Sequence, residues 1–191
     1  HVPCFALTGP YAGSDATSMP DTGVVCKGEF EGKEIIGIKL NFSKRYITLA
    51  PIATLIGLAF KMHDPDHLIG EVNDYGITCA LLPKELEGLE SGRRHIPIGS
   101  PFMNGTITGE NVFIPLDYII GGVERAGEGW KMLTDCLSAG RAIVLPSGAM
   151  SGAKAAVAVT GAYARAREQF GMPIAEFEGI LEPLGRMAGR T

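Results

Sequence analysis

The sequence predicts an α+β chain in two parts. An antiparallel β-barrel or β-sandwich domain should cover residues 1–122, and the first long helices of an all-α bundle should follow over residues 123–191. In the first part, short runs of apolar and β-branched residues alternate with turn-forming clusters. After Gly121 and Gly122 the chain becomes rich in Ala, Met and Leu at helical spacing. The 26 glycines and 12 prolines follow no repeat, which is typical of turns between short strands.

The strands of the first part are expected in order along the chain. Residues 24–29 and 35–42 flank Glu31-Gly32-Lys33, so these two stretches should form a hairpin. The other strand-like stretches are residues 46–49, 52–61, 76–82, 106–108 and 111–114. Turns are expected between them at Asp64-Pro65-Asp66, Glu87-Gly88, Asn104-Gly105 and Gly109-Glu110.

The helical part begins with one long periodic stretch over residues 127–170, with Gly171 as the expected stop. Pro146 lies inside the stretch and should kink or break the helix, because it cannot donate a backbone hydrogen bond. A second helix should begin near residue 174. A helix of roughly 60 Å needs partner helices, and the chain opens at His1 without Met. We therefore expect a segment of a longer protein.

Composition excludes several classes of protein. Lys and Arg total 17 against 21 acidic residues, so no basic field is available for nucleic acid. The four cysteines, at 4, 26, 79 and 136, have neither the spacing of a zinc or thioredoxin-like site nor the density of a disulfide scaffold. The apolar stretch 52–60 is too short to span a bilayer. We expect no transmembrane segment, no metal and a cytoplasmic location.

Two segments have the chemistry of a ligand site. Residues 5–15 carry Gly, Pro and the hydroxyls of Thr8 and Ser14, so this loop could hydrogen-bond a cofactor ring or a phosphate. An ordinary surface turn has the same composition. Tyr46 and Thr48 would share one face of a strand, where an aromatic ring could cover a flat ligand and a hydroxyl could bond its edge. Simple strand propensity explains the same residues.

Three polar groups leave the choice between function and surface open. Arg141 and Arg167 lie in the helical part, and each could pair with a phosphate or form an ordinary surface ion pair. His63-Asp64-Pro65-Asp66-His67 resembles a metal cluster in composition, although its proline favours a solvated loop. No Ser-His-Asp or Cys-His arrangement and no pair of catalytic carboxylates is evident.

The order of these motifs resembles the acyl-CoA dehydrogenase family from the first residue to the last. Residues 5–8 and 12–15 resemble the family's flavin-contact signature, and Tyr46-Ile47-Thr48 resembles its second flavin segment, commonly Trp-Ile-Thr. Gly127-Glu128-Gly129-Trp130 resembles the opening of the family's long helix. Arg141 and the Arg-x-x-Phe-Gly segment at 167–171 fall where the family has an arginine and the same segment. Residues 44–51, 76–83 and 115–122 look most like the bacterial FadE-type long-chain enzymes.

The resemblance implies FAD as cofactor and a fatty acyl-CoA as substrate. The cofactor would contact Phe5, Leu7, Thr8, Ser14, Tyr46, Ile47, Thr48 and, across a homodimer, Arg167. The substrate would contact Ser14, Ser138 and Arg141. The reaction would be α,β-dehydrogenation to the trans-2-enoyl-CoA in fatty-acid β-oxidation, with electrons passed to an electron-transfer flavoprotein. The protein would act in the bacterial cytoplasm, with peripheral attachment to the inner membrane left open.

The sequence departs from the family pattern at several positions. Gly9 stands where the family usually has Glu, Ser138 where it often has Asp, and Phe177-Glu178 where some members have His-Gln. The family's catalytic Glu would lie beyond residue 191, so this segment alone should be inactive. Two alternatives remain: an acyl-CoA oxidase or flavin monooxygenase on the same scaffold, and a flavin-free acyl-CoA-binding scaffold.

Overall fold

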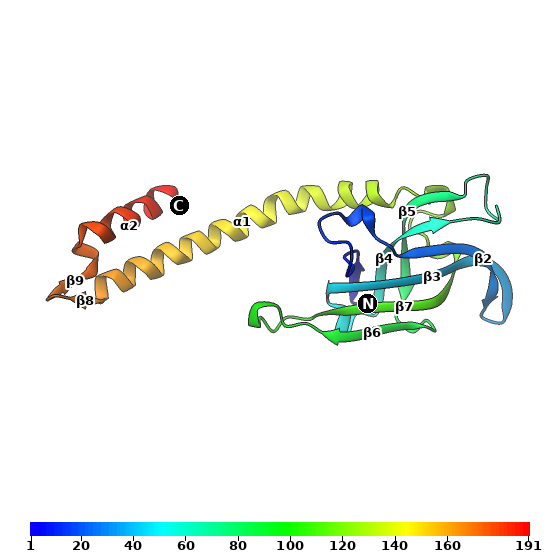
Figure 1. The fold of residues 1–191 in the computed structure, drawn as a ribbon, viewed down its shortest axis with the longest axis horizontal. Helices are drawn as coiled ribbons and strands as arrows, with labels where there is room; N and C mark the ends of the chain where they lie inside the picture. The colour runs from blue at the N-terminus through cyan, green and yellow to red at the C-terminus, as the bar shows by residue number, and fades with distance from the viewer. The chain divides into compact units, whose positions relative to one another are not determined.

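The computed structural model describes residues 1–191, which form two compact units, His1–Leu133 and Thr134–Thr191. The units divide within the long helix α1 (Gly129–Ala166), later in the chain than the change of sequence texture near residue 122. Figure 1 shows the strands of the first unit and the helices of the second.

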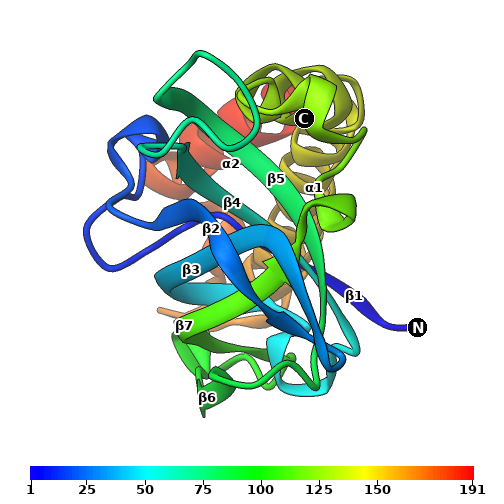
Figure 2. The same ribbon diagram turned by 90° about the vertical axis from the view of Figure 1, so that its right-hand side faces the viewer.

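The first unit is one seven-stranded sheet that curls into a half-barrel (Figure 2). Its order is β1-β4-β2-β3-β7-β6, and β5 pairs with β4. Most neighbours are antiparallel, as expected, but β1 and β2 both run parallel to β4. The strands are β1 (Pro3–Ala6), β2 (Thr22–Phe30), β3 (Lys33–Thr48), β4 (Leu55–His63), β5 (Asp74–Pro83), β6 (Leu89–Arg94) and β7 (Asn104–Pro115).

The predicted hairpin is confirmed and forms the longest antiparallel pair near the start of the chain. Strands β2 and β3 pair from Thr22 opposite Asn41 to Phe30 opposite Lys33. The two loop residues, Glu31 and Gly32, have φ of 51° and 76°. Two consecutive left-handed residues give a turn whose twist matches the twist of the flanking strands. Gly32 meets this requirement at no steric cost.

Two predicted turns are wrong, because Asn104-Gly105 and Gly109-Glu110 both lie inside the continuous strand β7. A Cβ on Gly109 would lie 2.2 Å from the ring of Phe42, so this glycine makes room for an aromatic ring on the neighbouring strand β3. Glycine in a strand often marks such a close approach. The short strands β1 and β6 were not expected.

The core of the first unit lies inside the curl of the sheet. Inward-facing side chains of the strands are fully buried there, among them Ile38, Leu40, Ile56, Leu58 and Ile107. A smaller apolar cluster lies under the loop between β1 and β2 and includes Ala12, Met19, Ala59, Ile77, Cys79 and Leu133. Leu133 belongs to the first turns of α1, so the start of that helix completes the cluster.

The second unit contains most of α1, a small hairpin and α2 (Glu178–Arg190). Helix α1 runs through Pro146 without the predicted break. It ends at Ala166, before the predicted stop. Strands β8 (Glu168–Gln169) and β9 (Met172–Pro173) follow, joined by Phe170 and Gly171 at φ of 55° and 80°. Gly171 therefore serves a hairpin turn rather than a helix end.

Helix α1 is long and apolar enough to cross a membrane by length and composition. Core helices of soluble proteins satisfy the same criterion. The prediction that the chain has no transmembrane segment was argued only from the apolar stretch 52–60, and it stays a prediction.

Candidate functional site

The loop between β1 and β2 occupies a gap along one edge of strand β4. Strand β1 pairs with this edge up to Leu58, and β2 pairs with it again from Lys61. Residues 7–21 leave and rejoin the sheet between these two points. Within the loop, the backbone N–H of Gly9 donates to the carbonyl of Ala12 at 3.1 Å, and the side chain of Ala12 is buried. The edge of the sheet thus anchors the whole first candidate segment.

The far side of this loop is organised by Asp15. Its carboxylate accepts hydrogen bonds from the hydroxyls of Thr17, at 2.8 Å, and Ser18. These hydrogen bonds, chiefly that from Ser18, lower the pKa of Asp15 below its ordinary value. The preceding Ser14 is left exposed at the surface.

The second candidate segment contains a β-bulge. Between Lys44 and Ile47 the register of β3 against β7 shifts, with one extra residue on β3. Tyr46 has φ of 59°, in the left-handed region that bulky residues rarely adopt. Ile47 is buried, whereas Tyr46 is 55% exposed and Thr48 is exposed. Bulges beside active sites commonly redirect a side chain in this way. Tyr46 and Thr48 are thus both exposed on either side of the buried Ile47, through a bulge rather than through regular strand alternation.

The structure brings the two segments together. The backbone N–H of Arg45 donates to the carbonyl of Thr8 at 2.9 Å, and the ammonium of Lys44 donates to the carbonyl of Leu7 at 2.9 Å. On β1, Phe5 lies across Gly57 of β4, where a Cβ would come within 2.7 Å of its ring. Phe5, Leu7, Thr8 and residues 46–48 therefore form one region of the first unit. Their proposed contacts with a cofactor stay predictions.

A buried ion pair beneath this region was missed by the sequence analysis. Lys44 Nζ lies 2.6 Å from Asp21 Oδ2, with exposures of 0% and 2%. Burial lowers the pKa of Lys44, and its hydrogen bond and charge interaction with Asp21 oppose that shift. Lys44 follows the buried Leu40 and Phe42 at alternate positions of β3. The alternation of inward-facing residues along this strand predicts that Lys44 is buried, and it was the signal in the sequence that could have identified the pair.

The exposed face of Tyr46 borders a cationic pocket. The ring of His95 packs against Tyr46 at 4.8 Å between centroids, with the two planes tilted by 45°, and the Arg45 guanidinium lies 5.1 Å from the centroid of the Tyr46 ring. His95 Nδ1 is 2.9 Å from Asn104 Oδ1, and Asn104 Nδ2 donates to the Thr48 hydroxyl at 3.5 Å. The adjoining pocket has a volume of about 440 Å³ and is lined by Tyr46, Arg93, Arg94, His95, Ile96 and Pro97.

The remaining predicted residues lie in the second unit. Ser138 and Arg141 occupy exposed positions one helical turn apart on α1. Arg167 follows the end of α1, where its carbonyl accepts from the N–H of Ile174 at 2.8 Å and its side chain is exposed. The geometry of the second unit leaves the predicted ligand contacts of all three residues as predictions.

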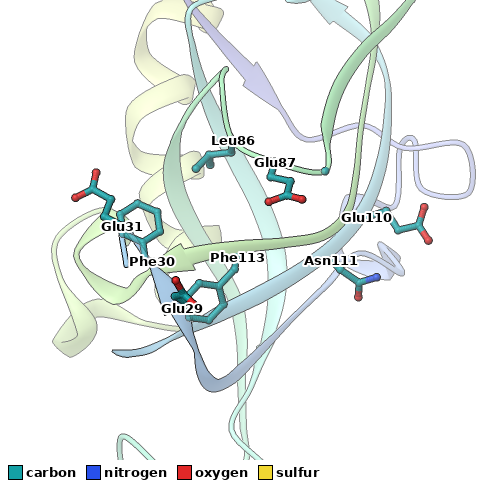
Figure 3. A pocket seen from close by; sticks show the side chains of 9 residues that line it. Glu29, Phe30, Glu31, Leu86, Glu87, Glu110, Asn111 and Phe113 are labelled. Carbon is teal, nitrogen blue, oxygen red and sulfur yellow. The ribbon is translucent and has the colours of Figure 1, made fainter. Parts of the chain in front are cut away.

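Another pocket of the first unit lies away from all these residues. It has a volume of about 470 Å³ at the turn end of the β2–β3 hairpin (Figure 3). Apolar and acidic side chains line it: Phe30, Leu86, Phe113, Glu29, Glu31, Glu87 and Glu110. None is a predicted site residue, so this pocket is not the candidate site.

Around residues 63–67, where the sequence resembles a metal cluster in composition, Asp64 has a structural role. Asp64 is buried, and its carboxylate accepts from the N–H groups of Leu68 and Ile69, both at 2.9 Å. No group of three or more His, Cys, Asp or Glu side chains in the chain could hold a metal ion. The apparent histidine and aspartate cluster is therefore a loop organised by Asp64.

Comparison with known families gives two adjacent matches. Residues 4–113 match the model described as acyl-CoA dehydrogenase, middle domain. Residues 127–191 match the model described as acyl-CoA dehydrogenase, C-terminal domain. The first match covers the β sheet with both candidate segments, and the second covers α1 to α2.

Three curated relatives span different parts of the chain. Protein HemX of Proteus mirabilis is 53% identical over 104 residues, 54% of this chain and 61% of that protein. An acyl-CoA dehydrogenase of Bacillus subtilis is 31% identical over 192 residues, 100% of this chain and 46% of its own length. Isovaleryl-CoA dehydrogenase of Solanum tuberosum is 33% identical over 185 residues, 94% of this chain and 40% of its own length. The chain spans about half the length of these relatives.

A solved structure agrees with both units. Acyl-CoA dehydrogenase of Bacillus anthracis, complexed with FAD, superimposes with a TM-score of 0.75 at 26% identity. The match covers 98% of this chain and 29% of that one. The curled sheet followed by long helices is therefore the fold of that flavoprotein's corresponding region.

Proposed function

Because the chain belongs to the acyl-CoA dehydrogenase family, we propose that the complete protein catalyses FAD-dependent α,β-dehydrogenation of medium- or long-chain fatty acyl-CoA in β-oxidation. The observation that carries the proposal is the junction between residues 7–8 and 44–48. The Thr8 carbonyl receives the Arg45 N–H, and the Leu7 carbonyl receives the Lys44 ammonium. This junction collects hydroxyls, an aromatic ring and a strained bulge at one place, as a cofactor site requires.

The residues at the junction fit a flavin. The half-exposed ring of Tyr46 lies between the cationic side chain of Arg45 and the ring of His95, and the Nε of Arg45 is a buried donor without a partner in the chain. FAD, when bound, would accept the hydride that leaves the substrate's β-carbon. The chain's own part is to hold and orient the ring through Phe5, Leu7, Thr8, Ser14, Tyr46, Ile47 and Thr48, with Arg167 for a phosphate. Ile47 is buried, so its side chain would act by supporting the bulge.

The substrate would be held by Ser14, Ser138 and Arg141. A guanidinium recognises phosphate through paired hydrogen bonds, so Arg141 suits the nucleotide end of coenzyme A. A hydroxyl at residue 14 can donate to the thioester carbonyl and stabilise the enolate that develops after loss of the α-proton. Ser14 is exposed, so its hydroxyl is accessible to a ligand.

Chain length is the finer part of the proposal. The sequence segments 44–51, 76–83 and 115–122 resemble those of FadE-type long-chain enzymes and favour that substrate class. The similarity to isovaleryl-CoA dehydrogenase favours a short branched substrate instead. We propose the long-chain class, with an electron-transfer flavoprotein as acceptor, a homodimer as the assembly and the bacterial cytoplasm, with or without peripheral attachment to the inner membrane, as the location.

The test is an anaerobic titration of the complete purified protein with palmitoyl-CoA, followed by the absorbance of oxidised flavin. Bleaching by palmitoyl-CoA, and a smaller response to isovaleryl-CoA, is the expected result. Bleaching by isovaleryl-CoA alone would move the substrate to the short branched class. A colourless protein that FAD cannot reconstitute would reject the enzyme and favour a flavin-free scaffold.

The acceptor is tested by admitting air to the reduced protein. Slow reoxidation in air and fast reoxidation by electron-transfer flavoprotein are expected for a dehydrogenase. Rapid reoxidation by oxygen would instead identify an acyl-CoA oxidase or flavin monooxygenase on the same scaffold.

A further inference from the structure

The ammonium of Lys44 donates hydrogen bonds both to the carboxylate of Asp21 and to a backbone carbonyl of the loop between β1 and β2. Besides Asp21 Oδ2 at 2.6 Å, Nζ donates to the carbonyl of Leu7 at 2.9 Å and contacts the sulfur of Met19 at 3.9 Å. Lys44 is completely buried, which is rare for lysine because desolvation of an ammonium is costly. Its charge is therefore placed where it holds the backbone of the loop.

The partner carboxylate links the same loop to two strands. Asp21 Oδ1 accepts the backbone N–H of Ser43 on β3 at 2.8 Å, and the Asp21 carbonyl accepts the N–H of Lys61 on β4 at 2.9 Å. Both carboxylate oxygens thus have partners, as a buried charge requires. The pair joins the start of the loop at Leu7, its end at Asp21, and strand β3 just before the bulge.

We propose that Lys44 and Asp21 form an ionic clamp of positioning residues that holds Leu7 and Thr8 against residues 45–48 in the arrangement that receives the flavin. This inference rests on the proposed function. Two apolar residues could fill the same space and stabilise the fold equally well. They could not donate to the Leu7 carbonyl, and that hydrogen bond is what the ion pair adds. Neither residue needs to touch the cofactor.

The glycine at residue 9 provides an internal check on the electrostatics. An ideal Cβ on Gly9 would lie 3.8 Å from Asp21 Oδ2 and 3.0 Å from the Ser43 carbonyl. Gly9 is outside the left-handed φ region, so a side chain there meets tight packing but no backbone strain. The side chain of a glutamate at residue 9 would therefore start within van der Waals distance of the Asp21 carboxylate that pairs with Lys44.

The first experiment uses the complete protein without flavin and measures amide hydrogen exchange at Gly9 and Arg45. Their N–H groups bond the carbonyls of Ala12 and Thr8, so they report the loop and its junction. Lys44→Met should accelerate both by at least about tenfold, as expected for loss of a charge-assisted hydrogen bond. Leu82→Ala, in the core on β5, is the control for general destabilisation. Equal exchange in Lys44→Met and Leu82→Ala, at matched stability, would overturn the clamp.

The second experiment moves the carboxylate. Asp21→Ser and Gly9→Glu should each destabilise the protein, the first by leaving Lys44 unpaired and the second by setting two carboxylates side by side. In the double variant the glutamate supplies the missing charge. The double variant should therefore be more stable, and its Arg45 amide more protected, than the sum of the two single losses predicts. This holds whatever the packing cost of the new side chain, because that cost is common to Gly9→Glu and the double variant. Additive or worse behaviour would refute the electrostatic role of the pair.

A third measurement connects the clamp to the cofactor. The FAD dissociation constant of Lys44→Met should rise about tenfold or more, while that of Leu82→Ala should stay near the wild-type value. Unchanged FAD affinity in Lys44→Met would overturn the positioning role. If the wild-type protein binds no FAD, the proposed function fails, and hydrogen exchange still decides whether the clamp orders the loop.

Discussion

Replacing Gly57 by alanine should displace Phe5 from its place on the sheet with only a modest loss of stability. The new Cβ would lie 2.7 Å from Cδ2 of the Phe5 ring, closer than such atoms pack, and 3.2 Å from Cε2. Phe5 is 37% exposed on strand β1, so its ring can rotate toward solvent. The sheet can keep its hydrogen bonds while the ring moves.

The magnitude follows from the burial of that ring. Full burial of a phenylalanine stabilises a protein by about 1.5–3 kcal/mol. Because 37% of Phe5 is exposed already, rotation forfeits at most about two-thirds of that value, or about 1–2 kcal/mol. An aromatic contact with a ligand ring contributes about 0.5–1.5 kcal/mol. The FAD dissociation constant should therefore rise by roughly twofold to thirteenfold.

The assay combines urea unfolding with flavin fluorescence quenching on the complete protein. Gly37→Ala is the matched control, because its Cβ would meet the Ile114 carbonyl oxygen at 2.5 Å on strand β7. A backbone oxygen cannot rotate away, so the control should lose at least as much stability with unchanged FAD affinity. If Gly57→Ala loses stability but binds FAD normally, Phe5 is not a flavin contact. If it loses neither, the ring is not held where the structure places it.

Three further predictions concern other sites. Tyr46→Ala should weaken FAD binding about tenfold while Tyr46→Phe preserves it, because the ring face and not the hydroxyl is expected to contact the flavin; fluorescence titration distinguishes them. Gly185→Ala should raise the free energy of unfolding by about 0.5–1 kcal/mol, since the glycine lies inside α2 with open space around it; thermal unfolding measures this. Burial raises the pKa of the Cys4 thiol from 9.0 to about 11. The unfolded thiol therefore ionises first, and stability should fall from pH 9 toward 11. Urea unfolding of Cys4→Ala across that range should show a shallower fall, and an identical slope would contradict the shift.

The local features of the fold were predictable from the sequence because neighbouring residues determine them. The β2–β3 hairpin needs only Glu31-Gly32 between two strand-forming runs. The long helix needs only a continuous run of good helix formers such as Ala, Leu and Met. The turns expected at residues 104–105 and 109–110 are absent, because glycine occurs both in turns and inside strands where another side chain comes close. At residue 109 it admits the ring of Phe42 from another strand, a contact that no local window reveals.

The two segments of the candidate site were predicted from the sequence, but the contacts that join them were not. Likeness to a family signature selected residues 5–15 and 46–48, and the structure shows that they meet through Thr8 and Arg45. The ion pair that joins them was not predicted, since Asp21 and Lys44 belong to segments whose pairing depends on the whole sheet. At Gly9, where the resemblance leads to the expectation of a glutamate, the structure places the Asp21 carboxylate nearby from the end of the same loop.

The orientation of Tyr46 depends on a single inserted residue. Along β3 the even-numbered positions 38, 40, 42 and 44 are buried, and strict alternation would bury Tyr46 and expose Ile47. The extra residue between Lys44 and Ile47 reverses the phase, so that Ile47 enters the core and Tyr46 faces outward. Lys44 is the last inward residue before the reversal. The same bulge therefore exposes the aromatic ring and leaves the ammonium directly beneath the loop that the ring adjoins.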